Sequence, residues 1–276
     1  MMRICTYCFL LSLAFLVLTG CAVKKSKDIT YSAEHKLQLD VYSPKKKETA
    51  KPVFIFIHGG SWNSGKKSMY DFLGKGMVKN GAVAVIIDYR LNDRTTYDGM
   101  AADAATAVEW IKQNISAYGG DTSKIYISGH SAGGHLAALI ATDNTYFNNL
   151  KIPNPIRGTI LIDGFGLDIN SYLKNAEPKY YNIFTPTFTS NQETWVSASP
   201  ISHLHKGMPP FLMFLGGKTG SGIIKDNSRF YESVMKIEPD TKLIVVKRKR
   251  HIGMIFQYVN RYNKGYKEII GFMKEK

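Results

Sequence analysis

The segment Ile125-Tyr-Ile-Ser-Gly-His-Ser-Ala-Gly-Gly-His-Leu-Ala-Ala138 decides the fold. Its apolar start is typical of a strand and its Ala/Leu-rich end of a helix, with the pattern Gly-x-Ser-x-Gly at residues 129–133 between them. A serine on such a strained turn needs glycines on either side, because a Cβ there would meet neighbouring backbone. The free amides of the following helix, beginning with Ala132, point toward whatever Ser131 attacks. We therefore predict that Ser131 is a nucleophile.

Working outward, strand-like and helix-like segments alternate along the chain. Continuous apolar runs are typical of strands that are covered on both faces, whereas Leu37, Leu39 and Val41 alternate with polar residues and predict a strand with one buried face. This order predicts an α/β fold with a mostly parallel sheet and helices on both faces. The predicted strands are 53–57, 83–87, 159–162 and 242–246, of which the first two are predicted to be buried, and the predicted helices are 67–80 and 99–116.

Composition indicates a globular protein with a basic surface. The chain has 276 residues, of which 44% are hydrophobic, and this suits one large domain, which we place at residues 31–276. The formal net charge is +14, with lysines and arginines clustered at 24–25, 45–47 and 247–250. These clusters are either solvated faces or surfaces that attract an anionic membrane or acidic glycans. No nucleic-acid recognition motif is visible, and we expect no nucleic-acid partner.

The N-terminus has the character of an export signal. A positive start and an apolar core at residues 9–18 precede Leu18-Thr-Gly-Cys21, which resembles the lipobox of bacterial lipoproteins. We therefore expect a signal peptide at 1–20, lipidation of Cys21 and a lipidated tether at 21–30; an uncleaved anchor helix is the alternative. Either reading places the domain in the bacterial cell envelope, outside the cytoplasm and attached to a membrane through its anchor.

Four motifs together resemble the α/β-hydrolase superfamily: His58-Gly-Gly-Ser-Trp62, Asp88-Tyr-Arg-Leu91, Tyr118-Gly-Gly-Asp121 and the segment 129–136. Within it, the chain is similar to carboxylesterases related to hormone-sensitive lipase and to kynurenine formamidase. The resemblance covers roughly residues 29–276 and implies an α/β-hydrolase fold. It also implies a small cap over the site, which we place in the aromatic-rich segment 169–200.

The resemblance also implies most of a catalytic site. The oxyanion hole is expected from the backbone amides of Gly60 or Ser61 together with Ala132. The base is expected beyond the last strand, where His251 follows residues 242–246. The other six histidines are expected to serve structural roles.

The triad acid departs from the family pattern. Gly220 occupies the expected acid position, and no carboxylate occurs between residues 211 and 225. Three alternatives stay open: Asp163 at the end of strand 159–162, Asp226 in the next helix, or a site without an acid. Because the strand 159–162 is expected beside the nucleophile strand, we favour Asp163.

These features predict a serine hydrolase that cleaves carboxylic esters through an acyl-enzyme. Export suits small acyl esters or acetyl and feruloyl esters on glycans, so a small-molecule or glycan ester is the expected substrate. The alternatives are an aryl formamidase and a catalytically weak binding relative that lacks the triad acid. No cofactor fingerprint or metal-ligand cluster is visible, and we expect neither.

Overall fold

A computed structural model describes residues 22–46 and 49–275, and its centre is one eight-stranded sheet. The strand order is β1-β2-β4-β3-β5-β6-β7-β8. The pairs β1/β2 and β2/β4 are antiparallel, and every pair from β4 to β8 is parallel. The strands are β1 (Val23–Ser32), β2 (Leu37–Pro44), β3 (Lys51–Ile57), β4 (Val83–Ile87), β5 (Gly120–His130), β6 (Ile156–Ile162), β7 (Phe211–Gly216) and β8 (Lys242–Val246).

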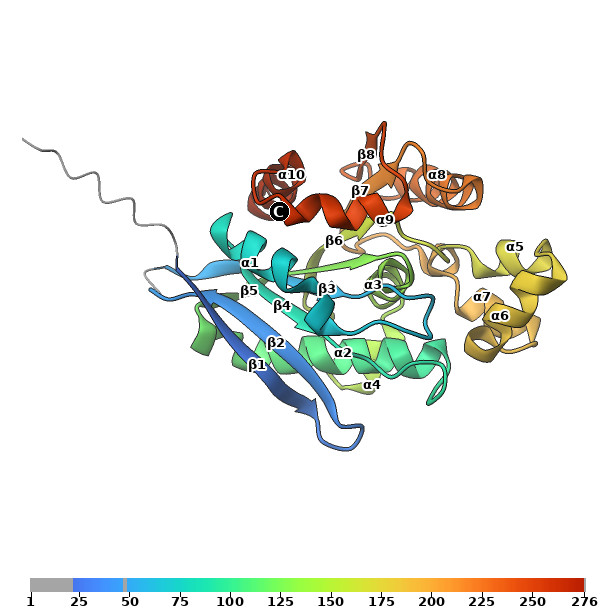
Figure 1. Ribbon diagram of the computed structural model, residues 1–276. Coiled ribbons are helices and arrows are strands. Elements are labelled where there is room, and N and C mark those ends of the chain that lie inside the picture. Colours follow the sequence, from blue (N-terminus) through green and yellow to red (C-terminus); the bar gives the residue numbers. More distant parts are fainter. Residues whose placement is uncertain (1–21, 47–48, 276) are drawn as a thin grey trace, which may run out of the picture.

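Helices cover both faces of this sheet (Figure 1). Side chains of α2, α3 and α8 pack on one face, and those of α1, α9 and α10 pack on the other. The α-helices are α1 (Asp71–Lys79), α2 (Tyr97–Asn114), α3 (Ala132–Thr142), α4 (Thr145–Asn149), α5 (Ile169–Lys174), α6 (Pro178–Phe188), α7 (Gln192–Ser197), α8 (Ser221–Met235), α9 (His251–Phe256) and α10 (Lys264–Glu275), and short 3₁₀ turns are η1 (Lys67–Tyr70), η2 (Ile115–Tyr118), η3 (Pro200–His203) and η4 (Gln257–Val259). The prediction of the fold class is confirmed.

The central strands owe their position to their continuous apolar runs. Residues 53–57 of β3 and 83–87 of β4 are fully buried, because parallel strands with helices on both faces expose neither face to water. The strand β5 pairs with β3 on one side and β6 on the other. The carboxyl ends of these three strands therefore meet at one edge of the sheet, where the Gly-x-Ser-x-Gly turn follows β5.

The expectation of one buried face for β2 is wrong. Asp40 and Tyr42 point away from Leu39 and Val41, and all four are buried. Helix α1 lies directly on Tyr42, since a Cβ added to Gly74 would lie 2.5 Å from the tyrosine ring. Asp40 is buried because it pairs with two lysines rather than with water. An alternating pattern therefore predicts exposure wrongly where the polar residue is buried in an ion pair.

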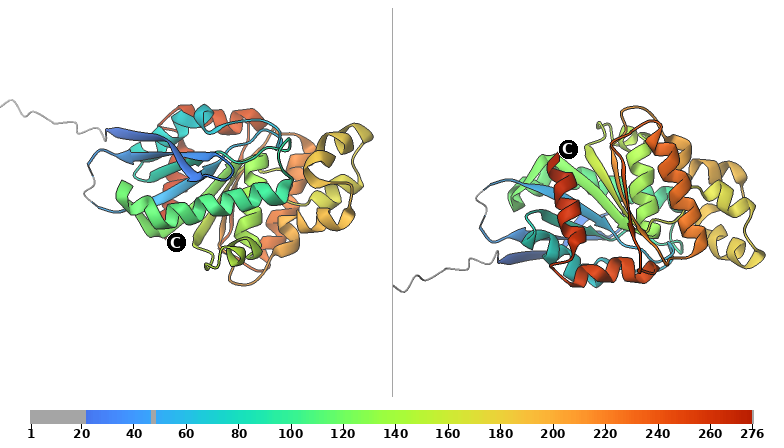
Figure 2. Two further views of the ribbon diagram at one scale, coloured as in Figure 1. Left: turned by 90° about the horizontal axis from the view of Figure 1, so that it is seen from below. Right: turned by 90° about the horizontal axis from the view of Figure 1, so that it is seen from above.

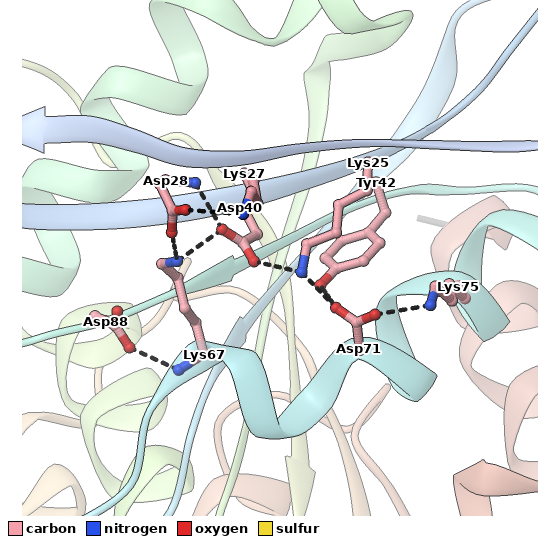
Figure 3. Close-up of polar contacts among 9 residues, drawn as sticks. All are labelled: Lys25, Lys27, Asp28, Asp40, Tyr42, Lys67, Asp71, Lys75 and Asp88. Atoms are coloured by element: carbon pink, nitrogen blue, oxygen red, sulfur yellow. Dashed lines mark hydrogen bonds and ion pairs between the residues drawn. The ribbon is translucent and has the colours of Figure 1, made fainter.

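The expected tether at 21–30 is not observed at residues 23–30, whereas residue 21 lies outside the described residues. Residues 23–32 form β1, which pairs with β2 and extends the sheet at its edge. The strand was not predicted because its lysines are typical of a solvent-exposed segment. Lys25 reaches back over the strand pair to Asp40 and Asp71, at 2.9 and 2.5 Å, so this charge is a packing element (Figure 3).

The predicted signal peptide at 1–20 and the lipidated Cys21 lie outside the described residues. Among residues 22–46 and 49–275, no helix combines the length and the apolar character needed to cross a bilayer.

Candidate active site

Ser131 sits at the sharp turn between β5 and α3. Its backbone has φ 55° and ψ −123°, a strained conformation for a residue with a side chain. A Cβ at Gly129 would lie 2.1 Å from the carbonyl oxygen of Gly133, and a Cβ at Gly133 would lie 2.1 Å from that of Ile57. The turn can therefore close only with glycine at both positions, as the sequence predicts.

His251 begins α9, after β8, and its ring faces the serine. Its Nε2 lies 2.9 Å from the Oγ of Ser131, while its Nδ1 lies 2.7 Å from the Oδ2 of Asp163. The histidine is one-quarter exposed, whereas Asp163 is fully buried. The structure thus brings together the three side chains that the sequence analysis favoured as nucleophile, base and acid.

Asp163 follows β6 and is held by the loop that follows β7. Its Oδ1 accepts a hydrogen bond from the amide of Gly216 at 2.7 Å, and its Oδ2 accepts one from the hydroxyl of Thr219 at 2.6 Å. The role of Thr219 was not predicted, because the carboxylate that it contacts lies 56 residues earlier, after another strand. The loop supplies donors to an acid on the neighbouring strand, and Gly220 itself faces open space, since a Cβ there would meet nothing within 4 Å.

Asp226 has a different task. It lies within α8, where its carboxylate accepts hydrogen bonds from the amides of Gly166, Leu167 and Asp168 at 2.9 to 3.0 Å. It therefore clamps the loop after β6, the loop that starts with Asp163. The alternatives that place Asp226 against His251, or leave the histidine without a carboxylate, disagree with this geometry. Burial raises the pKa of Asp226 to about 6.

The loop after β3 carries three consecutive residues with positive φ: Gly60 at 132°, Ser61 at 50° and Trp62 at 60°. Ser61 lines the same cavity as Ser131 and His251. Ala132 is the first residue of α3, so its amide has no acceptor within its own helix. This arrangement suits the oxyanion donors predicted at Gly60 or Ser61 and Ala132, and their role stays a prediction.

Three buried histidines support the site. His58 is fixed by Tyr89, whose hydroxyl donates to the His58 carbonyl at 3.1 Å. His130 stacks on the ring of His251 at 4.6 Å between centroids. His135 accepts from the indole of Trp62 at 3.2 Å and faces the carbonyl of Ala198 at 2.7 Å, which makes its Nε2 the donor.

Burial lowers the pKa of His58, His130 and His135 from 6.5 to about 4 each, and for His130 the nearby His251 adds to this. Between these two pKa values the three histidines are protonated in the unfolded chain and neutral in the folded one. We therefore expect the free energy of unfolding to fall as the pH drops from 6.5 through 4. Each histidine contributes a slope of up to about 1.4 kcal/mol per pH unit. Urea unfolding at a series of pH values measures this slope. A free energy of unfolding that stays constant between about pH 7 and about pH 5 would contradict the prediction.

A cavity of about 710 Å³ opens over Ser131 and His251 and is lined in part by the cap helices α5 and α6. These helices lie beyond one end of the sheet (Figure 1). Tyr172 and Tyr180 line the cavity, whereas Phe184 and Phe188 pack edge-on against Trp62. The cap therefore both packs on the domain and contributes aromatic surface to the cavity. Within the described part of the chain, no group of three or more His, Cys, Asp or Glu side chains could hold a metal ion.

Comparisons with known proteins find one family and several esterases. The model of the BD-FAE family matches residues 39–231. An isoprenylcysteine alpha-carbonyl methylesterase of Arabidopsis thaliana is 26% identical over 84% of this chain and 57% of its own length. Esterase LipQ of Mycobacterium tuberculosis is 32% identical over 60% of this chain and 40% of its own length. The chain thus spans about half the length of the curated relatives it matches.

Solved structures show the same fold. Esterase B from Lactobacillus rhamnosis superposes with a TM-score of 0.75 at 19% identity, covering 92% of this chain and 85% of its own. A thermophilic esterase from the Planctomycetes species Thermogutta terrifontis superposes with a TM-score of 0.69 at 24% identity, covering 92% and 94%. The mostly parallel sheet with helices described above is therefore an α/β-hydrolase fold.

Proposed function

Because the chain belongs to the BD-FAE family, within the α/β-hydrolase carboxylesterases, we propose that it hydrolyses carboxylic esters through an acyl-enzyme on Ser131. The observation that carries this proposal is the hydrogen-bonded row from Ser131 to His251 to Asp163 at 2.9 and 2.7 Å. Such a row is what a serine needs to act as a nucleophile at neutral pH.

In the acylation step, the Oγ of Ser131 attacks the ester carbonyl while the Nε2 of His251 takes its proton. Asp163 accepts from the Nδ1–H of His251, which leaves Nε2 free to act as base, and its negative charge stabilises the imidazolium that forms. The developing oxyanion is held by the amide of Ala132 and by that of Gly60 or Ser61. Each such donor is worth about 3 kcal/mol in a well-formed hole. His251 then returns the proton to the leaving alcohol.

Deacylation repeats these steps with water as the nucleophile. His251 takes a proton from the water that attacks the acyl carbonyl, and returns it to Ser131 as the acid product leaves. Through both halves, the amide of Gly216 and the hydroxyl of Thr219 donate to the fully buried Asp163 and hold its carboxylate against His251.

The substrate that we propose is a small acyl ester or an acetyl or feruloyl ester on a glycan. Tyr172 and Tyr180 offer aromatic faces, and Asn175 and Lys225 offer polar groups, in one cavity of about 710 Å³. Relatives at 26% to 32% identity carry the names methylesterase and esterase, which supports the ester bond as the target. The alternative of a binding relative without a triad acid loses its main argument, because a carboxylate stands at His251.

The test uses residues 22–276, which hold every described strand and helix. We expect this protein to hydrolyse p-nitrophenyl acetate above the buffer rate. We also expect a fluorophosphonate to add once per chain, to the peptide that contains Ser131, because a tetrahedral phosphonate on that oxygen resists hydrolysis. A folded protein without turnover and without this adduct would refute the proposal.

A further inference from the structure

Apolar side chains gather on the outside of the protein beside α9. Ten large apolar side chains are exposed in the described part of the chain, and five of them lie at residue 69 and within residues 252–262. Isolated exposed apolar residues are ordinary, but a contiguous group marks an interaction surface. The five are Met69, Ile252, Phe256, Val259 and Tyr262, with exposed fractions from 56% to 72%.

Three of these side chains share one helical face that lies beside α1. Ile252, Phe256 and Val259 follow the spacing of one helical face along α9 and η4. The ring of Phe256 stacks on Phe72 of α1 with 6.1 Å between centroids, and Met69 lies one turn before Phe72. Helices α1 and α9 lie along the same side of the molecule in both views of Figure 2. We call Met69, Phe72, Ile252, Phe256 and Val259 the α9 face.

Ile252, Phe256 and Val259 of the α9 face lie within a stretch of sequence that contains no acidic residue. Residues 241–267 contain eight lysines and arginines and no aspartate or glutamate. In the described part of the chain, Lys242 pairs with Glu275, while the run 247–250 just before α9 forms no ion pair with a described carboxylate. The surface therefore presents apolar side chains beside cations that no acid neutralises.

The start of the described chain is fixed beside this face. Lys25 of β1 binds Asp71 at 2.5 Å, and Asp71 is the neighbour of Phe72 in α1 (Figure 3). Tyr42 donates to the same carboxylate at 2.5 Å, and Lys75 binds its other oxygen at 2.7 Å. This network holds β1 against α1, the helix that carries Phe72 of the α9 face.

We propose that the α9 face and the basic run 247–250 dock on the headgroup layer of an anionic phospholipid bilayer. Apolar side chains that insert among acyl chains, beside lysines and arginines at the level of anionic headgroups, are the chemistry of peripheral membrane surfaces. Ile252 directly follows His251, so docking places the helix of the catalytic histidine against the membrane.

The experiment measures vesicle binding of residues 22–276, which removes the apolar segment 9–18 from the result. We expect this protein to float with vesicles that contain phosphatidylglycerol and much less with vesicles of phosphatidylcholine alone. Added salt should weaken the binding, because exposed charges are screened.

Two variants separate the apolar and charged contributions. Phe256→Ser/Val259→Ser should weaken binding about tenfold or more, since two apolar side chains no longer leave water. Lys247→Gln/Arg248→Gln should weaken it about 30-fold, since each cation near an anionic surface contributes about a factor of five. All variants should hydrolyse p-nitrophenyl acetate as the parent does, which shows that they are folded.

The matched controls carry the same changes elsewhere. Ile183→Ser/Val196→Ser alters apolar residues of the cap that are 48% and 42% exposed, and Lys45→Gln/Lys46→Gln alters another basic cluster. Both should bind as the parent does. The proposal is overturned if the parent binds neither vesicle, if the controls lose as much as the test variants, or if Phe256→Ser/Val259→Ser abolishes only self-association. Binding to an acidic polysaccharide without binding to vesicles would likewise overturn it.

Discussion

Replacing Ser131 with alanine should lower kcat for p-nitrophenyl acetate by about 10⁶. The alanine has no oxygen to form the acyl-enzyme, so only water attack aided by the oxyanion donors remains. The substitution removes one atom from a side chain that is 9% exposed, and alanine tolerates the turn no worse than serine does. We therefore expect the same unfolding temperature as the parent. Steady-state kinetics and thermal unfolding measure the two effects.

The control for this result is Ser61→Ala. Ser61 lines the same cavity, but we assign its role to the backbone amide, which alanine keeps. Ser61→Ala should therefore retain kcat within about tenfold, since its amide stays in the oxyanion loop. If Ser131→Ala hydrolysed the ester as fast as Ser61→Ala, the serine nucleophile would be excluded.

The sequence predicted those parts of the molecule in which the backbone itself imposes residue type. A Cβ at position 129 or 133 would lie 2.1 Å from a carbonyl oxygen, so only glycine fits there, and the motif identifies the turn. The buried strands were equally visible, because strands covered on both faces must be apolar along their whole length. Both signals are local, and both are dictated by steric exclusion.

The remaining features depend on partners far along the chain. The sequence predicted a tether where the edge strand β1 lies, because the partners of Lys25, Asp40 and Asp71, are not adjacent to it in the sequence. The triad acid could not be settled for the same reason. A carboxylate after β6 serves the histidine only because the loop after β7 offers Gly216 and Thr219 as donors rather than an acid of its own. Pairings across 46 to 56 residues leave no periodic signal.

Replacing Asp163 with asparagine should lower kcat by about 10⁴ while the fold persists. The Oδ1 of Asp163 accepts from Gly216, so an asparagine that keeps this bond turns its amide nitrogen toward Thr219 and the Nδ1 of His251. That nitrogen can only donate. His251 must then carry its proton on Nε2, where it can no longer accept the proton of Ser131. Steady-state kinetics measures the loss of kcat. The protein concentration is taken from absorbance, because labelling with a fluorophosphonate would itself depend on the activity of the site.

Asp226→Asn is the matched comparison, because this carboxylate is also buried and accepts three backbone amides but does not contact His251. It should lower the unfolding temperature by several degrees through the weakened clamp on residues 166–168, and leave the kcat of the folded fraction within about tenfold of the parent. The two variants therefore separate orientation of the base from stability of the loop. Should Asp163→Asn keep kcat within the same tenfold range, the histidine would be oriented without Asp163, and the site would act as a serine–histidine dyad. Equal losses of kcat in both variants would instead show that the loop, rather than the charge at His251, limits the rate.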